Sequence, residues 1–270
     1  MDDDLYLAGM DAMVDRIDDS YVRGRAPHLD QYLDRAERFI GRPISGVVAD
    51  LGCGLGELVA VLSRRPLVQK VIGLDYSPAV IERARTRTLD ALGADRTKVV
   101  LMVGLFEATG LPDGACDMVV EKNAFHHADD LEAVARETFR VLRPGGWFVG
   151  IDRVLRDEVT NAEVEARLDQ PLGQDLLQRY GFDRVVTRRD MHEHDHRRSD
   201  WVHAFNAAGF RTFVVQIFPL EEMSLVKRIP LKMFFMLVGD FLLQRRLTLF
   251  PYFNWFSDVR HCLVLCERPH

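Results

Sequence analysis

Short apolar runs alternate with longer amphipathic stretches through the first half of the chain. The predicted strands are rich in Val, Ile and Leu and cover Val47–Leu51, Val71–Leu74, Val99–Val103, Met118–Val120 and Trp147–Ile151. Apolar residues at helical spacing lie between them, from Glu57, from the Ser77-Pro78 pair and over Leu131–Leu142. Alternation of this kind is typical of parallel βαβ units and predicts a doubly wound α/β sheet.

The segments on either side of this core have weaker patterns. Residues 5–40 place apolar side chains on one helical face and predict a helical arm that breaks near Gly24 and Pro27. The pattern loosens after Asp152, and a predicted helix about Asp200–Ala208 and a strand Phe210–Phe218 follow. It loosens again before a last predicted strand, Cys262–Cys266.

Neither loose segment is long enough for a core of its own. We therefore expect a single domain over 1–270. It divides into a helical N-terminal arm, a cofactor-binding core and two insertions that cap the substrate, at 1–46, 47–152, 153–198 and 219–260.

Composition narrows the class of protein. The 270 residues are 47% hydrophobic, and 35 basic against 41 acidic side chains leave a net charge of -6, which disfavours a nucleic-acid partner. The acidic N-terminus lacks the features of a secretory signal, and the four cysteines form no C-x-x-C pair. The strongest apolar run, Leu231–Leu243, is interrupted by Lys232 and Asp240. We therefore expect a cytoplasmic protein with reduced thiols and no transmembrane segment.

The first predicted strand runs directly into a turn that holds an acid and three glycines. They occupy every second position and are Asp50, Gly52, Gly54 and Gly56. Glycines let a ligand approach the backbone closely, although a tight turn without a ligand is the alternative. The dinucleotide fingerprint would need a further glycine at position 57 or 59, where Glu57 and Val59 stand, and no P-loop ending follows.

Acidic residues end the next two strand regions. Asp75 lies 21 residues after Gly54, where an acid can accept the hydroxyls of a ribose. Alternatively it caps the helix that follows, but Ser77 already suits that role. The pair Glu107-Ala108 follows the third strand.

Together these residues resemble the class I S-adenosylmethionine-dependent methyltransferases, in particular the small-molecule branch that includes the quinone-biosynthesis enzymes. The resemblance is close over 47–152 and looser over 199–218 and 261–267. It implies S-adenosylmethionine as cofactor and a Rossmann-like, seven-stranded, mostly parallel sheet with helices on both faces and an antiparallel last strand.

The resemblance also implies roles for individual residues. The glycine motif from Asp50 to Gly56 receives the amino-acid end of the cofactor, and Asp75 binds its ribose. Tyr76 lies beside the adenine, Glu107 and Ala108 lie at the adenine edge, and Asn123 belongs to the cofactor site. Glu107 stands where Asp is commoner in the family.

Histidines supply the candidate catalytic groups. The segment Glu121–His127 follows the fourth strand, so it is expected beside the transferred methyl. His127 is either a base or substrate anchor, or it packs beneath the loop with His126.

Three further histidines alternate in the first insertion, at His192, His194 and His196. On an extended segment they would share one side and could bind a metal, but the flanking charges favour a solvated loop, and methyl transfer needs no metal. The other interpretation brings His194 or His196 into the substrate pocket. We take His127 and His196 as candidate catalytic residues and expect no metal site.

An apolar segment, Leu231–Phe256, lies in the second insertion. It is interpreted as a cap on the sheet or a homodimer contact. The alternative is a lid for a lipid-linked acceptor, with Arg245 and Arg246 near phosphate head groups at a membrane surface.

The sequence as a whole predicts methyl transfer from S-adenosylmethionine to an oxygen or nitrogen of a small molecule. The acceptor is expected to be a natural product, a glycan or a lipid-like compound, and the transfer an in-line displacement with a histidine base. The alternative is a non-catalytic or repurposed S-adenosylmethionine-binding accessory protein. The sequence does not name the acceptor.

Overall fold

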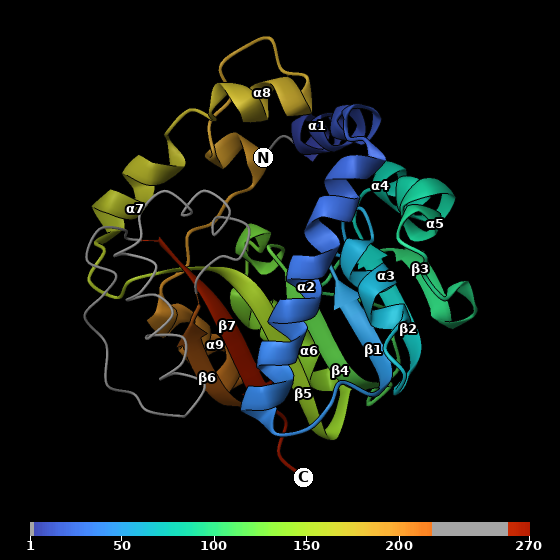
Figure 1. The fold of residues 1–270 in the computed structure, drawn as a ribbon. Coiled ribbons are helices and arrows are strands. Elements are labelled where there is room, and N and C mark those ends of the chain that lie inside the picture. The colour runs from blue at the N-terminus through green and yellow to red at the C-terminus, as the bar shows by residue number, and fades with distance from the viewer. Residues whose placement is uncertain (1–2, 218–258) are drawn as a thin grey trace, which may run out of the picture.

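The computed structural model describes residues 3–217 and 259–270 (Figure 1). Seven strands form one sheet in the order β3-β2-β1-β4-β5-β7-β6. The strands are β1 Gly46–Leu51, β2 Val68–Asp75, β3 Val99–Val103, β4 Cys116–Lys122, β5 Leu142–Leu155, β6 Arg211–Gln216 and β7 Val259–Glu267. Pairing is parallel from β3 through β5, whereas β7 is antiparallel to both β5 and β6. The predicted fold class, including the antiparallel last strand, is confirmed.

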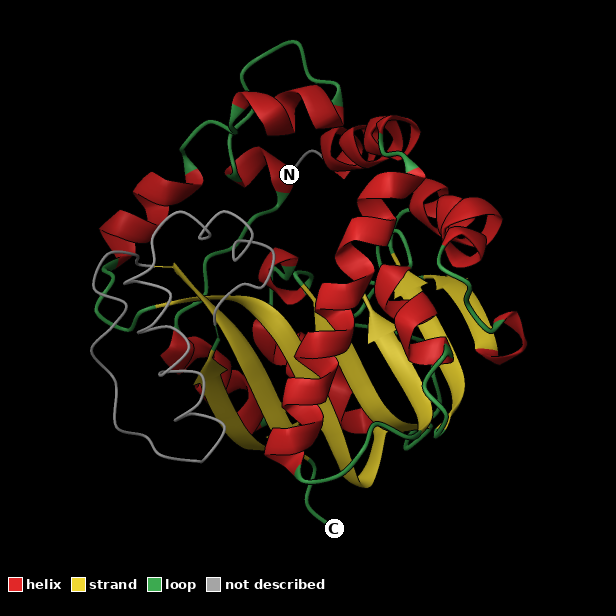
Figure 2. Ribbon diagram, in the orientation of Figure 1, coloured by secondary structure: helices red, strands yellow, loops and turns green. Residues whose placement is uncertain are grey.

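Helices cover both faces of this sheet (Figure 2). Their bounds are α1 Asp3–Arg16, α2 Asp19–Ile40, α3 Glu57–Ser63, α4 Pro78–Arg83, α5 Leu89–Ala91, α6 Leu131–Val141, α7 Asn161–Leu168, α8 Gln174–Tyr180 and α9 Arg198–Ala207. One apolar core packs α2 and α3 against the sheet, and a second packs α6 and α9 against the opposite face. The second core holds stacked aromatic rings, with Phe125 and Phe148 centroids 5.3 Å apart.

The N-terminal arm differs from the prediction. The expected break near Gly24 and Pro27 is wrong, because α2 runs through both residues. The chain breaks instead before α2, where the Asp18 carboxylate accepts the backbone N–H groups of Ser20 at 2.8 Å and Tyr21 at 3.1 Å and starts a new helix. A proline inside a helix costs about 3 kcal/mol, but burial of a long apolar face opposes that cost. The buried residues of this face are Val22, Ala26, Leu29, Tyr32, Leu33 and Ala36.

The first insertion folds against the N-terminal arm. Helix α8 lies beside α1 beyond the carboxyl ends of the strands (Figure 1). A small apolar cluster joins them, with Leu177 and Met191 buried against Leu5 and Tyr6.

The division of the chain into core and insertions stays a prediction, and Leu231–Phe256, with Arg245 and Arg246, lies outside the described residues. No helix within 3–217 and 259–270 has the length and apolar character that a membrane crossing requires.

Candidate active site

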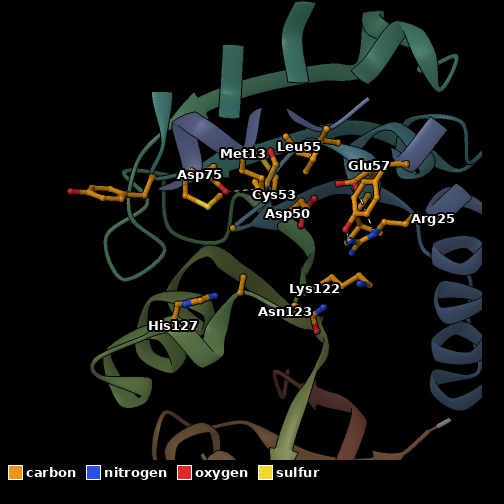
Figure 3. A pocket seen from close by; sticks show the side chains of 18 of the residues that line it. Met13, Arg25, Asp50, Cys53, Leu55, Glu57, Asp75, Lys122, Asn123 and His127 are labelled. Atoms are coloured by element: carbon orange, nitrogen blue, oxygen red, sulfur yellow. Dashed lines mark hydrogen bonds and ion pairs between the residues drawn. The ribbon is translucent and has the colours of Figure 1, made fainter. Parts of the chain in front are cut away.

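A cavity of about 270 Å³ lies where the strands β1, β2 and β4 end. In parallel sheets this edge collects the loops that bind ligands. The floor includes Asp50, Asp75 and Asn123, and the roof comes from α1, α2 and α8. Figure 3 shows His127 on one side of the opening and Arg25 with Glu57 on the other.

The glycine turn between β1 and α3 supplies the floor. Gly52 has φ +77°, and a Cβ on it would lie 2.4 Å from the Cβ of Ala124, so no larger residue fits there. Gly54 has φ +53°, and a Cβ on it would meet nothing within 4 Å. Because Gly54 lines the cavity, this open space is a cradle in which a ligand can approach the backbone.

Asp50 lies at the bottom of the cavity with only 1% of its surface exposed. Neither of its carboxylate oxygens has a hydrogen-bond partner in the described part of the chain. Burial, and then the negative charges of Asp75 and Glu57, raise the pKa of Asp50 well above its usual range. A buried carboxylate without a partner is costly, so Asp50 favours a cationic group in the cavity.

Asp75 is held by two backbone donors. The N–H of Gly54 donates to its Oδ2 at 2.8 Å and the N–H of Ser77 to its Oδ1 at 3.0 Å. Each oxygen keeps a lone pair, so the carboxylate can also accept the hydroxyls of a ribose. The helix-capping alternative does not hold, because the Ser77 hydroxyl caps α4 by accepting the N–H of Val80 at 3.2 Å.

The other predicted cofactor residues divide into two groups. Tyr76, 40% exposed, and Asn123 line the cavity. Gly56 does not: it precedes α3 with φ +83°, and a Cβ on it would lie 2.9 Å from Ala84, which is a packing role. Glu107 and Ala108 do not line the cavity either, but their neighbour Phe106 does. Their position at the adenine edge stays a prediction.

His127 is the histidine that the described structure brings to the cavity. Its Nδ1 lies 2.9 Å from the carbonyl oxygen of His192. A carbonyl can only accept, so Nδ1 carries the hydrogen and Nε2 keeps a free lone pair. Burial lowers the pKa of His127, which favours this neutral form near neutral pH.

His126 does not line the cavity but holds the turn that carries His127 through its contacts with Asp152. Its Nδ1 lies 2.6 Å from Asp152 Oδ1, and its backbone N–H donates to Asp152 Oδ2 at 3.1 Å. Burial, and secondarily the charges nearby, lower the pKa of His126 well below its usual range. The imidazole therefore stays neutral and holds the turn that carries His127.

Only two histidines of the first insertion lie on one side as an extended segment would place them: the rings of His194 and His196 stack with their centroids 6.2 Å apart. A 3₁₀ turn, Arg189–Met191, precedes His192, which has a left-handed backbone with φ +51°. His194 pairs with Asp129 at 2.9 Å, and His196 packs edge-on against Trp201. Neither lines the cavity described above, so entry of His196 into a substrate pocket stays a prediction.

A different trio comes together: His126, His127 and Glu193 place one ligand atom each within 4.8 Å of one another. However, the Glu193 carboxylate pairs with Arg153, and with Arg188 at 3.2 Å. Two guanidinium groups on this carboxylate oppose a divalent cation there.

Sequence reasoning missed the roof of the cavity. It includes Tyr6 from α1, Tyr21 and Arg25 from α2, and Arg179 and Tyr180 from α8. The Tyr6 ring lies 5.7 Å from the His127 ring, and burial raises the pKa of Tyr6. These residues belong to ordinary amphipathic helices, and no local signal in the sequence marks them as cavity residues.

Part of this chain is similar to known methyltransferases. Residues 49–150 match the family described as Methyltransferase domain. Demethylmenaquinone methyltransferase of Thermus thermophilus is 35% identical over 135 residues, which are 48% of this chain and 54% of that protein. A probable S-adenosylmethionine-dependent methyltransferase of Mycolicibacterium smegmatis is 36% identical over 121 residues, 44% of this chain and 40% of that protein. The matched region thus spans about half the length of these curated relatives or less.

The solved structure of YcgJ from Bacillus subtilis has a similar fold. Its TM-score is 0.56 at 18% identity, covering 90% of this chain and 98% of that one. These matches bear out, over residues 49–150, the resemblance to the S-adenosylmethionine-dependent methyltransferases.

Proposed function

We propose that this protein, whose residues 49–150 match the Methyltransferase domain family, transfers the methyl group of S-adenosylmethionine to a nucleophilic oxygen or nitrogen of a small molecule. One observation carries the proposal. The same cavity holds an unpartnered buried carboxylate at Asp50, an open glycine turn at Gly54, the acid Asp75 and the neutral imidazole of His127.

The residues present fit the cofactor. Asp50 offers a negative charge at the bottom of the cavity, which suits the ammonium and sulfonium groups of S-adenosylmethionine. Gly54 leaves room for the amino-acid end, and Asp75 can accept both ribose hydroxyls. When bound, the cofactor supplies an electrophilic methyl group for in-line displacement.

The contribution of the chain to the transfer is alignment and proton removal. The roof helices α1 and α2 and the floor enclose the reacting groups, and positioning of this kind contributes up to about 7 to 11 kcal/mol to lowering a barrier. The free Nε2 of His127 accepts the proton of an acceptor hydroxyl or amine, while Nδ1 keeps its hydrogen on the His192 carbonyl.

The direct test is to incubate the protein with methyl-labelled S-adenosylmethionine and a small-molecule cell extract. We expect one class of extracted compound to gain the label. Tight binding of the cofactor without transfer to any extracted compound would instead favour the accessory-protein alternative.

The base is tested with His127→Ala, which should lower turnover by about 10²- to 10⁴-fold and leave the affinity for S-adenosylhomocysteine nearly unchanged. Because burial lowers the pKa of His127, wild-type turnover should persist into mildly acidic pH and fall only below the usual histidine range. The His196→Ala variant decides between the two predicted histidines, and exposed His203→Ala is the control. Normal turnover in His127→Ala would rule out a histidine base at this position.

A further inference from the structure

The roof of the cavity carries an arginine, Arg179, that has no carboxylate partner among the described residues. Arg179 lies in the last turn of α8 and lines the cavity. Its guanidinium carbon lies 5.2 Å from the centre of the Tyr21 ring, and Nη1 lies 3.5 Å from the Tyr21 hydroxyl. Within 3–217 and 259–270, no carboxylate lies within 4.0 Å of this guanidinium.

Most other arginines of the same insertion are paired. Seven of them lie within 4.0 Å of a carboxylate: Arg153, Arg156, Arg167, Arg188, Arg189, Arg197 and Arg198. Arg184 has no such partner among the described residues, but it is exposed and does not line the cavity. Arg179 differs from all of these because it lies on a tyrosine ring in the cavity without an acid.

A second guanidinium shares the same tyrosine. Arg25 also lies 5.2 Å from the Tyr21 ring centre and donates to the Tyr21 hydroxyl. Arg25 has the carboxylate of Glu57 at 3.6 Å. Arg179 therefore lies beside a second guanidinium on the same ring, and an anion bound at Arg179 would reduce their mutual repulsion.

The position of Arg179 connects this charge with the reacting centre. Its neighbour Tyr180 packs in the same small apolar cluster as Tyr6, and the Tyr6 ring in turn contacts His127. A group bound at Arg179 therefore shares one cavity with the candidate base and with the glycine turn.

We propose that Arg179 and Tyr21 form an anion site in the cavity roof that binds a carboxylate through the guanidinium fork and the tyrosine hydroxyl. This inference rests on the proposed function, which supplies two sources of that group. One is the amino-acid end of the cofactor, and the other is an acid group on the acceptor that is not itself methylated.

The test compares Arg179→Gln with wild type and with Arg184→Gln, a control at an exposed arginine of the same insertion that does not line the cavity. The first arm measures binding of S-adenosylhomocysteine and of 5′-methylthioadenosine, which lacks the amino-acid end. The second arm titrates 4-hydroxybenzoate and its uncharged amide into protein saturated with S-adenosylhomocysteine.

We expect Arg179→Gln to weaken one carboxylate ligand by roughly 10- to 100-fold while its uncharged counterpart and the Arg184→Gln control are unchanged. Weaker S-adenosylhomocysteine binding with unchanged 5′-methylthioadenosine binding identifies the cofactor as the source. Loss of binding confined to 4-hydroxybenzoate identifies an acid group on the acceptor as the source of the carboxylate.

Unchanged binding of both carboxylates in Arg179→Gln overturns the inference. Equal weakening of the charged and uncharged ligands also overturns it, because the residue then acts on the fold of the cavity. Failure of the wild-type protein to bind S-adenosylhomocysteine is a different result, which refutes the proposed function itself.

Discussion

Replacing Gly54 by Ala separates the cost of backbone strain from the loss of ligand binding. At φ +53° an alanine is in the left-handed region, which costs about 1 to 2 kcal/mol for a residue with a Cβ. The added methyl meets nothing within 4 Å, so no packing clash adds to that cost. We expect the variant to fold, with a melting temperature lower by roughly 2 to 8 °C.

The binding effect comes from the same methyl group. It projects into the open space beside a residue that lines the cavity, where we place the amino-acid end of the cofactor. The ligand must then move away from the turn and lose its close contact with the backbone. We expect at least about tenfold weaker binding of S-adenosylhomocysteine, which corresponds to about 1.4 kcal/mol.

Gly93 provides a matched control. It has φ +62°, a Cβ on it also meets nothing within 4 Å, and it does not line the cavity. Gly93→Ala should therefore lose a similar amount of thermal stability and bind S-adenosylhomocysteine as the wild type does. Scanning fluorimetry measures the stability and titration calorimetry the affinity. Equal affinity in Gly54→Ala and Gly93→Ala would refute the reasoning, because the turn would then not contact the ligand.

Three further predictions concern the acids of the floor and the metal. Asp75→Ala should weaken the binding of S-adenosylhomocysteine by about 1 to 3 kcal/mol in calorimetry, because the ribose hydroxyls and the Gly54 N–H lose their acceptor. Unchanged affinity would contradict the role of this acid. In the cofactor-free protein, burial raises the pKa of Asp50, so the stability that its protonated carboxyl contributes is present at low pH and is lost as the pH rises through that pKa. In urea unfolding, Asp50→Asn should therefore be more stable than wild type at pH 8 and show a much smaller gain at pH 5. An equal difference at both pH values would be evidence against a buried, unpartnered carboxylate. Exhaustive chelation should leave methyl transfer unchanged, and loss of activity that zinc, iron or magnesium restores would direct attention to His126, His127 and Glu193.

The sheet and its first glycine turn could be predicted because their signals are local. The β-branched runs from Val47 to Ile151 define five strands, and the glycines after Asp50 define the first turn. Strand periodicity and glycine φ values depend on adjacent residues, so sequence reasoning finds them. The prediction for α2 failed for the opposite reason. Propensity favours a break at Pro27, but burial of the helix face on both sides of it outweighs that preference.

The roof of the site was decided by tertiary packing alone. Tyr6 and Arg25 lie on consecutive helices, whereas Arg179 lies about 150 residues further along the chain, and their meeting over the glycine turn depends on how α1, α2 and α8 pack together. The choice among histidines has the same origin. The sequence offers several, but the pairing of His127 with the His192 carbonyl, and its place on the cavity wall, require a contact across 65 residues. Local sequence therefore determined the glycine turn, whereas long-range packing decided which charges and which imidazole face it, because such contacts are set by the summed burial of whole helices.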